Sequence, residues 1–177
     1  MELRFRTARA TKDLDFTVRA KPDGVLEYLQ DAEALDIGDL FAFRIGEAMV
    51  DLDGAPYGGS RYPVEAILGG RTFVKFHLDV GVGDVIVDPV EFVRTRDWLG
   101  FAGVAAPDVP MIQREQQFAE KLHAYTLPRP TAPNSRVRDL VDLVLLIRSG
   151  TLDATRVVER LPRTFARRET LPVPRTL

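Results

Sequence analysis

The alternation of apolar and polar residues is most regular in the run from residue 71 to residue 80. Because successive side chains of a strand point to opposite faces, this run predicts a strand with one uniformly apolar face. The residues of that face are Val74, Phe76, Leu78 and Val80. We expect this face to pack on the core, which places Asp79 on the opposite, more polar face.

Shorter runs predict three more strands. Residues 14–18 alternate in polarity and become β-branched toward the end, and residues 41–45 and 62–68 are short and mainly apolar. The Gly69-Gly70 pair, between the runs at 62–68 and 71–80, is typical of a hairpin turn.

Helical spacing follows a turn at residues 21–24 and dominates after residue 110. Apolar residues recur at helical intervals over 25–35, 111–125, 135–147 and from 153 to 160 or beyond. Asn134 and Ser135 are good N-cap residues for the third of these helices. Its second half, from residue 140, is apolar except for Asp142, so we expect it to be mostly buried.

Prolines set the expected limits of these helices. Three of them make residues 127–133 a loop, and Pro162, Pro172 and Pro174 predict an irregular C-terminal end. The pattern as a whole predicts an α+β protein. Residues 1–108 should form an α/β core with a mixed sheet and flanking helices, and residues 109–177 a helical C-terminal subdomain.

Composition narrows the class of protein. The chain has 177 residues, which is enough for one domain with an appended subdomain, and it has no cysteine for a disulfide or a cysteine–metal site. No apolar run could span a bilayer and the first residues lack a signal core, so we expect a soluble, cytoplasmic protein without membrane contact.

Charge is unevenly distributed behind a formal net charge of −2. Residues 22–60 hold nine acids and one base, whereas residues 151–177 hold six arginines and three acids. The net charge speaks against a strongly basic nucleic-acid-binding domain, but the C-terminal arginines are suited to phosphate. The alternative explanation of the preference for arginine is codon bias in a GC-rich genome.

Three acids on neighbouring predicted strands are candidates for chemistry. Asp13 and Asp15 are separated by one residue at a strand start, so they point the same way, and Asp79 lies on the polar face of its strand. Such a set can hold two Mg²⁺ or Mn²⁺ ions about 4 Å apart, which activate an attacking oxygen and stabilise a leaving pyrophosphate. Solvated turn chemistry at Asp13 and Asp15, and an open sheet face at Asp79, are the alternatives.

A second candidate group lies on the predicted helices. Lys121 is beside the apolar stripe of residues 118, 122 and 125, and Asp139 and Asp142 lie in the first turns of the next helix. Lys121 could bind a phosphate, with Asp139 or Asp142 on the sugar, the base or Lys121 itself. The structural alternatives are a lysine that extends to solvent and acids that complement the helix dipole.

Three blocks of sequence resemble the AbiEii-type nucleotidyltransferase toxins of type IV toxin–antitoxin systems, within the polymerase-β-like superfamily. Residues 9–16, Arg-Ala-Thr-Lys-Asp-Leu-Asp-Phe, look like the first catalytic block of the family. Residues 115–124 look like its helical lysine block, and residues 136–143 like its closing Asp-x-x-Asp block. Asp79 matches the third-carboxylate strand of the superfamily.

The resemblance implies a polymerase-β-like sheet and a magnesium-dependent transfer of NMP from NTP to RNA, with the 3′ end of tRNA as one acceptor. It also implies a cognate antitoxin as partner and a role in phage defence. It assigns the metal ligands to Asp13, Asp15 and Asp79, and nucleotide binding to Thr11 and Lys121. Asp139 and Asp142 complete the implied catalytic set.

The family has a Gly-Gly or Gly-Ser turn upstream of its Asp-x-Asp motif, whose backbone N–H groups cradle the triphosphate. Only ten residues precede Thr11, and none is glycine, so the sequence is expected to lack this segment. Two alternatives to the toxin function stay open. One is an inactive, truncated relative that binds a protein partner or a second copy of itself, and the other is a small-molecule nucleotidyltransferase of the antibiotic-modifying type.

Overall fold

The computed structural model describes residues 1–5, 8, 13–19, 22–52, 55–128 and 136–174. The chain forms two compact units, one of Thr11–Asp84 and one of Met1–Ala10 with Val85–Leu177. The second unit includes residues on both sides of residue 108, and the domain boundary expected there stays a prediction.

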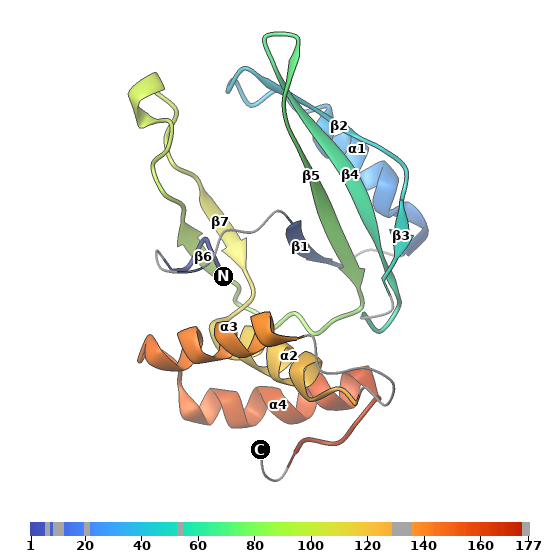
Figure 1. Cartoon of the computed structure of the whole chain (residues 1–177), viewed down its shortest axis with the longest axis vertical. Coiled ribbons are helices and arrows are strands. Elements are labelled where there is room, and N and C mark those ends of the chain that lie inside the picture. The colour runs from blue at the N-terminus through green and yellow to red at the C-terminus, as the bar shows by residue number, and fades with distance from the viewer. Residues whose placement is uncertain (6–7, 9–12, 20–21, 53–54, 129–135, 175–177) are drawn as a thin grey trace. The chain divides into compact units, whose positions relative to one another are not determined.

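The first unit is built on a mixed sheet (Figure 1). Its elements are β1 (Asp13–Val18), α1 (Val25–Glu33, preceded by a 3-10 turn at Pro22–Gly24), β2 (Phe41–Ile45), β3 (Val50–Asp51), β4 (Gly59–Leu68) and β5 (Arg71–Val82). The strand order is β1-β5-β4-β2, with β3 paired to β4. β1 runs parallel to β5, and the other pairs are antiparallel.

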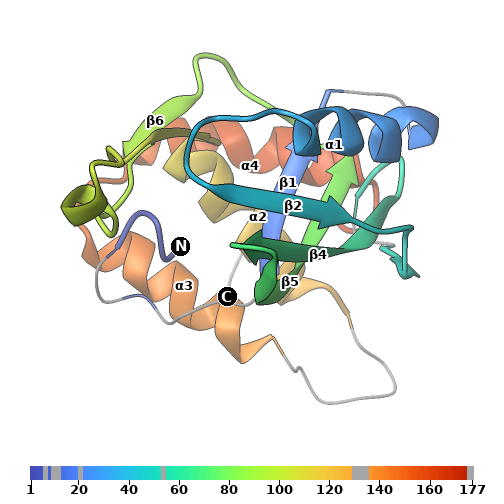
Figure 2. The same ribbon diagram turned by 90° about the horizontal axis from the view of Figure 1, so that it is seen from above.

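One face of this sheet is the core, as the alternation in β5 predicts for Phe76, Leu78 and Val80, whereas Val74 is 44% exposed. Leu78, Val80 and Val82 of β5 are buried with Val25 and Leu29 of α1. The helix runs beside β2 in Figure 2 and contacts it. The opposite face is left to the polar residues of β1, β4 and β5.

The β4–β5 hairpin has a register shift that decides which residues meet. Gly69 and Gly70 form the turn with φ of 58° and 75°, a conformation that L side chains rarely adopt. Ile67 pairs with Thr72, but Ala66 pairs with Val74, so β5 carries one extra residue at this point.

The second unit combines a two-stranded sheet with three helices (Figure 1). Its elements are β6 (Glu91–Arg94), a 3-10 turn (Gly100–Ala102), β7 (Asp108–Met111), α2 (Arg114–Thr126), α3 (Val137–Arg148) and α4 (Ala154–Arg168). α2 contacts both other helices. The sequence pattern did not predict β6 and β7, which are only four residues long, and β7 contains a proline.

Two helix limits expected from the sequence are wrong. Met111 ends β7, and α2 begins only at Arg114. Pro162 lies inside α4 rather than after it. The helix continues past Pro162, which is exposed, and its next turn is anchored by Thr164 and Phe165, which are buried. Gln116 of α2 also donates a hydrogen bond to the Thr164 hydroxyl.

The expected burial of the apolar half of α3 is also wrong. The stripe that faces the protein interior consists of Asp139, Asp142, Leu143 and Leu146, whereas Val141, Val144 and Ile147 are 43–59% exposed. A helix can bury only one stripe, and α3 buries the one that carries the two acids because a cation of α2 meets them there. The expected cap residues Asn134 and Ser135 lie outside the described residues.

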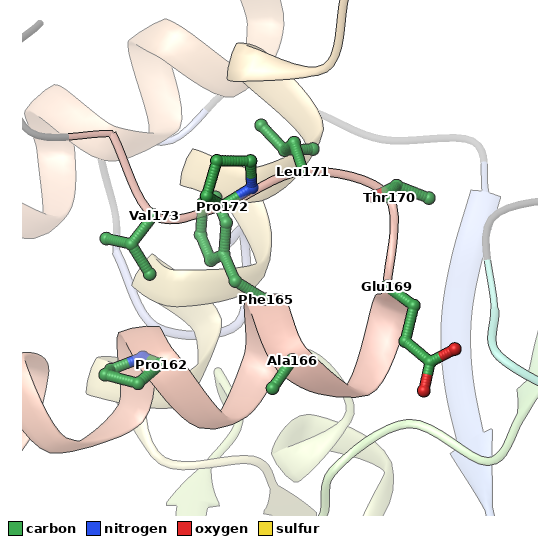
Figure 3. A pocket seen from close by; sticks show the side chains of 8 residues that line it. All are labelled: Pro162, Phe165, Ala166, Glu169, Thr170, Leu171, Pro172 and Val173. Atoms are coloured by element: carbon green, nitrogen blue, oxygen red, sulfur yellow. The ribbon is translucent and has the colours of Figure 1, made fainter.

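The segment after α4 folds back onto the helices. Leu171 and Val173 pack on the cluster formed by Leu122, Leu143 and Phe165. Between this segment and α4 lies a shallow, mostly apolar depression (Figure 3). Among the predicted site residues that the structure describes, none lines it. In the described part of the chain, no helix has the length and apolar character that crossing a membrane requires.

His123 links α2 to this returning segment. Its side chain is buried, with Nε2 2.6 Å from the Thr170 hydroxyl and its ring edge-on to Phe165. Burial, with a smaller contribution from the nearby charge of Arg168, lowers the pKa of His123 to about 4. The histidine is therefore neutral in the folded protein down to acidic pH.

We predict that the protein loses stability as pH falls from about 6.5 to about 4. In this window the unfolded chain binds a proton at residue 123 and the folded chain does not, which is worth about 3 kcal/mol at the acid end. Unfolding by urea at several pH values would measure this loss. His123→Gln should flatten this part of the curve.

Candidate functional site

The acids predicted on neighbouring strands lie in two adjacent rows on the polar face of the first unit. Asp15 of β1 is the direct register partner of Asp79 of β5, and Asp13 is the partner of His77. Partners on adjacent strands point to the same face, as do residues two apart on one strand. Asp13, Asp15 and Asp79 therefore lie on one face, as the sequence predicted.

A residue that the sequence analysis missed completes this row. Arg61 of β4 is the register partner of Asp79 on the other side, so Asp15, Asp79 and Arg61 form one row across three strands. Its guanidinium donates two hydrogen bonds to Asp79, from Nε to Oδ1 at 2.7 Å and from Nη2 to Oδ2 at 2.6 Å. This is the bidentate geometry that makes arginine–carboxylate pairs strong.

Arg61 also interacts with the other acids of this face. Its Nη2 atom lies 3.9 Å from Oδ1 of Asp13, and Nδ1 of His77 lies 3.5 Å from the same oxygen. The pKa of the Arg61 guanidinium is raised above its ordinary value. The main cause is the hydrogen bonding to Asp79, and the charges of Asp79, Asp13 and Asp15 add to it while burial opposes it.

The polar face is open enough for a ligand to reach it. The side chain of Asp79 is 15% exposed, that of Arg61 34% and that of Asp13 38%. The acids are therefore neither fully solvated nor sealed in the core. Their charges act in an intermediate environment, in which a bound cation is attracted more strongly than in water.

The chemistry of this donor set fits a divalent cation. Carboxylate oxygens are the ligands that Mg²⁺ and Mn²⁺ prefer, and a positive group, the guanidinium, already lies between Asp79 and Asp13. Within the described part of the chain, no three acidic or histidine side chains are gathered around one point as a metal cage. Both oxygens of Asp79 are instead turned to Arg61. The metal site stays a prediction.

The second predicted group lies in the helical unit, and the structure brings its three members together. Nζ of Lys121 on α2 is 2.7 Å from Oδ2 of Asp142 and 3.3 Å from Oδ1 of Asp139, both on α3. Arg136 adds a second cation, with Nη1 3.4 Å from Oδ2 of Asp139. The two acids are three residues apart and so occupy neighbouring positions on one helix face.

Because this cluster is largely shielded from water, each of its charges is costly in free energy unless it is paired. The side chain of Asp142 is 1% exposed, that of Asp139 13% and that of Lys121 20%. A carboxylate as buried as Asp142 is tolerated only with a partner, and the Lys121 ammonium provides it. The ammonium is held in place by two acids and keeps some exposure, which suits a group that positions an anionic ligand.

Three more arginines of the basic C-terminal region are on the surface of α4. Arg156, Arg163 and Arg167 are exposed, whereas Arg160 is buried and contacts Gln113. The three exposed guanidinium groups face solvent, and the buried one is part of the packing. Thr11, predicted to bind nucleotide, lies outside the described residues.

Comparison with known proteins gives one family and one type of fold. A family model described as nucleotidyl transferase AbiEii toxin, type IV toxin–antitoxin system, matches residues 1–177. No match was found among curated proteins.

Among solved structures, the chain is similar to MenT4, a nucleotidyltransferase toxin from Mycobacterium tuberculosis H37Rv. The TM-score is 0.58 at 22% sequence identity, over 88% of this chain and 49% of that chain. The chain therefore spans about half the length of this structural relative.

The likeness to MenT4 concerns the fold, and the predicted α+β architecture with a mixed sheet and a helical C-terminal part is confirmed. The three sequence blocks that suggested the family lie within the matched range. Since the match extends over the whole chain, the protein belongs to the AbiEii family of nucleotidyl transferase toxins of type IV toxin–antitoxin systems.

Proposed function

We propose that this chain carries catalytic residues of a metal-dependent nucleotidyltransferase that moves NMP from NTP to an RNA acceptor, with the 3′ end of tRNA as the first candidate. The observation that carries the proposal is the register of β1 and β5, which sets Asp15 beside Asp79 and Asp13 on the same open face. A cognate antitoxin is the proposed protein partner, in keeping with the family's description.

In this reaction the acceptor hydroxyl oxygen attacks the α-phosphorus of the NTP. A new phosphorus–oxygen bond forms, the bond to the bridging oxygen of the β-phosphate breaks, and pyrophosphate leaves. Asp13, Asp15 and Asp79 are the proposed ligands of Mg²⁺ or Mn²⁺, which supplies electrostatic stabilisation of the attacking and leaving oxygens. Asp79 is also the proposed acceptor of the hydroxyl proton.

Lys121 is the proposed ligand of a nucleotide phosphate. Asp142 and Asp139 hold its ammonium from one side, which reduces the freedom that the side chain would lose on binding. The proposed role of the two acids is to position Lys121. The Lys121 contacts also have a structural value, so the two roles need separate tests.

For the acid set, we predict that Asp13→Asn lowers transfer of labelled NMP to total tRNA by about a hundredfold or more, because a neutral amide is a poor ligand for a divalent cation. The measurement is label in tRNA after incubation with each of the four α-labelled NTPs and Mg²⁺. Asp31→Asn, an identical change at an exposed position of α1, should leave transfer unchanged. Equal transfer by wild type and Asp13→Asn would contradict the proposal, and no transfer by a folded wild type would favour an association module.

For Lys121, we predict that Lys121→Met lowers the free energy of unfolding by about 3–5 kcal/mol, since Asp142 is left buried and unpaired. The double change Lys121→Met with Asp142→Asn removes both charges and should recover most of this stability. Transfer should stay at background in both proteins. Wild-type transfer rates in the double variant would reduce Lys121 to a structural residue.

For the arginines of α4, we predict that Arg163→Gln together with Arg167→Gln weakens tRNA binding and lowers the slope of log K against log salt concentration by about two. Both side chains are exposed, so stability should change little. Titration of fluorescent tRNA at several salt concentrations gives the slope. Arg94→Gln, at an exposed position of β6, is the matched control, and an equal loss in that variant would argue against an RNA surface on α4.

A further inference from the structure

Arg61 already interacts with part of the proposed metal-binding set. Its guanidinium takes both oxygens of Asp79 and reaches toward Asp13, so two of the three proposed metal ligands already interact with a positive charge. The bidentate pair occupies one lone pair on each Asp79 oxygen, and its positive charge opposes the approach of a second cation to the same carboxylate.

The pairing of Arg61 with Asp79 depends on the register shift in the β4–β5 hairpin. A two-residue hairpin turn at 69–70 without the register shift would set Arg61 opposite Leu78, on the core face. The extra residue of β5 instead places Arg61 opposite Asp79 and Tyr62 opposite Leu78. The bulge therefore places Arg61 beside the acids and Tyr62 in the core.

The Arg61–Asp79 pair is partly exposed, so its two members can separate and a different cation can reach Asp79. The Arg61 side chain is 34% exposed and reaches the row from the end of a long, flexible stem. Unlike the buried pair of Lys121 and Asp142, this pair can open into water, where a free guanidinium is stably charged and solvated.

From these observations we infer that Arg61 is a displaceable counter-cation of the acid set. It holds Asp79 in the absence of metal, and a divalent cation competes with its positive charge for the carboxylate oxygens of Asp79. Arg61 is thus a positioning residue that lowers the affinity for metal. This inference rests on the proposed metal-dependent function, but it concerns the metal-binding step alone.

The test is direct binding of Mn²⁺ to the full chain without nucleotide, followed by the loss of free-ion signal in electron paramagnetic resonance. Arg61→Gln should bind Mn²⁺ about tenfold more tightly than wild type, which corresponds to about 1.4 kcal/mol. Arg61→Lys, which keeps the charge but loses the bidentate geometry, should lie between the two. Thermal unfolding checks that both variants are folded. If Arg61→Gln does not fold, the comparison of Arg61→Lys with wild type tests the inference.

Arg44→Gln is the matched control. Arg44 is the register partner of Glu65 on the same sheet, so its removal takes the same charge from the sheet at a position outside the acid row. Its Mn²⁺ affinity should match that of wild type. In an Asp79→Asn background, Arg61→Gln should improve Mn²⁺ binding by a much smaller factor, because the two residues act through one contact.

Several outcomes would overturn the inference. Equal or weaker Mn²⁺ binding by Arg61→Gln and Arg61→Lys would make Arg61 a structural residue or an organiser of the acids. An equal gain with and without Asp79 would show a general charge effect, and no Mn²⁺ binding by any variant would also refute it. None of these results decides whether the protein transfers NMP, since transfer to tRNA is measured separately with Asp13→Asn.

Discussion

The need to neutralise carboxylates that are partly or fully buried shapes both units of this protein. In the sheet unit, Asp79 is 15% exposed and takes two hydrogen bonds from Arg61. In the helical unit, Asp142 is 1% exposed and forms an ion pair with Lys121. Each pairing crosses between two elements, so the same contact that satisfies an acid also fixes how those elements pack.

The two pairs differ in what they allow. The Lys121 cluster includes two acids and two cations, and its Asp142 is 1% exposed, so its opening would leave a carboxylate in a poorly solvated place. The Arg61 pair is partly exposed, and each of its members can be solvated when they separate. The helical cluster is therefore suited to hold a lysine in a fixed position, and the sheet pair is suited to exchange one cation for another.

Local pattern predicted most elements of the sheet unit well. The alternation over residues 71–80 identified the core face of β5 and placed Asp79 on the other side, and the two glycines at 69–70 identified the hairpin. The pattern was less informative for α3. There the apolar residues outnumber the polar ones, but burial follows the stripe of Asp139 and Asp142, because Lys121 on another helix stabilises it.

The sequence by itself determined the candidate acids, the lysine and the family, because these depend on residue types at short spacings that one chain segment contains. It did not determine Arg61, the strands β6 and β7 or the continuation of α4 past Pro162. Arg61 meets Asp79 only because one extra residue in β5 shifts the hairpin register, and a bulge has no clear local signature. The other two depend on packing between distant segments, whose energy outweighs the local preference of a short strand or a proline.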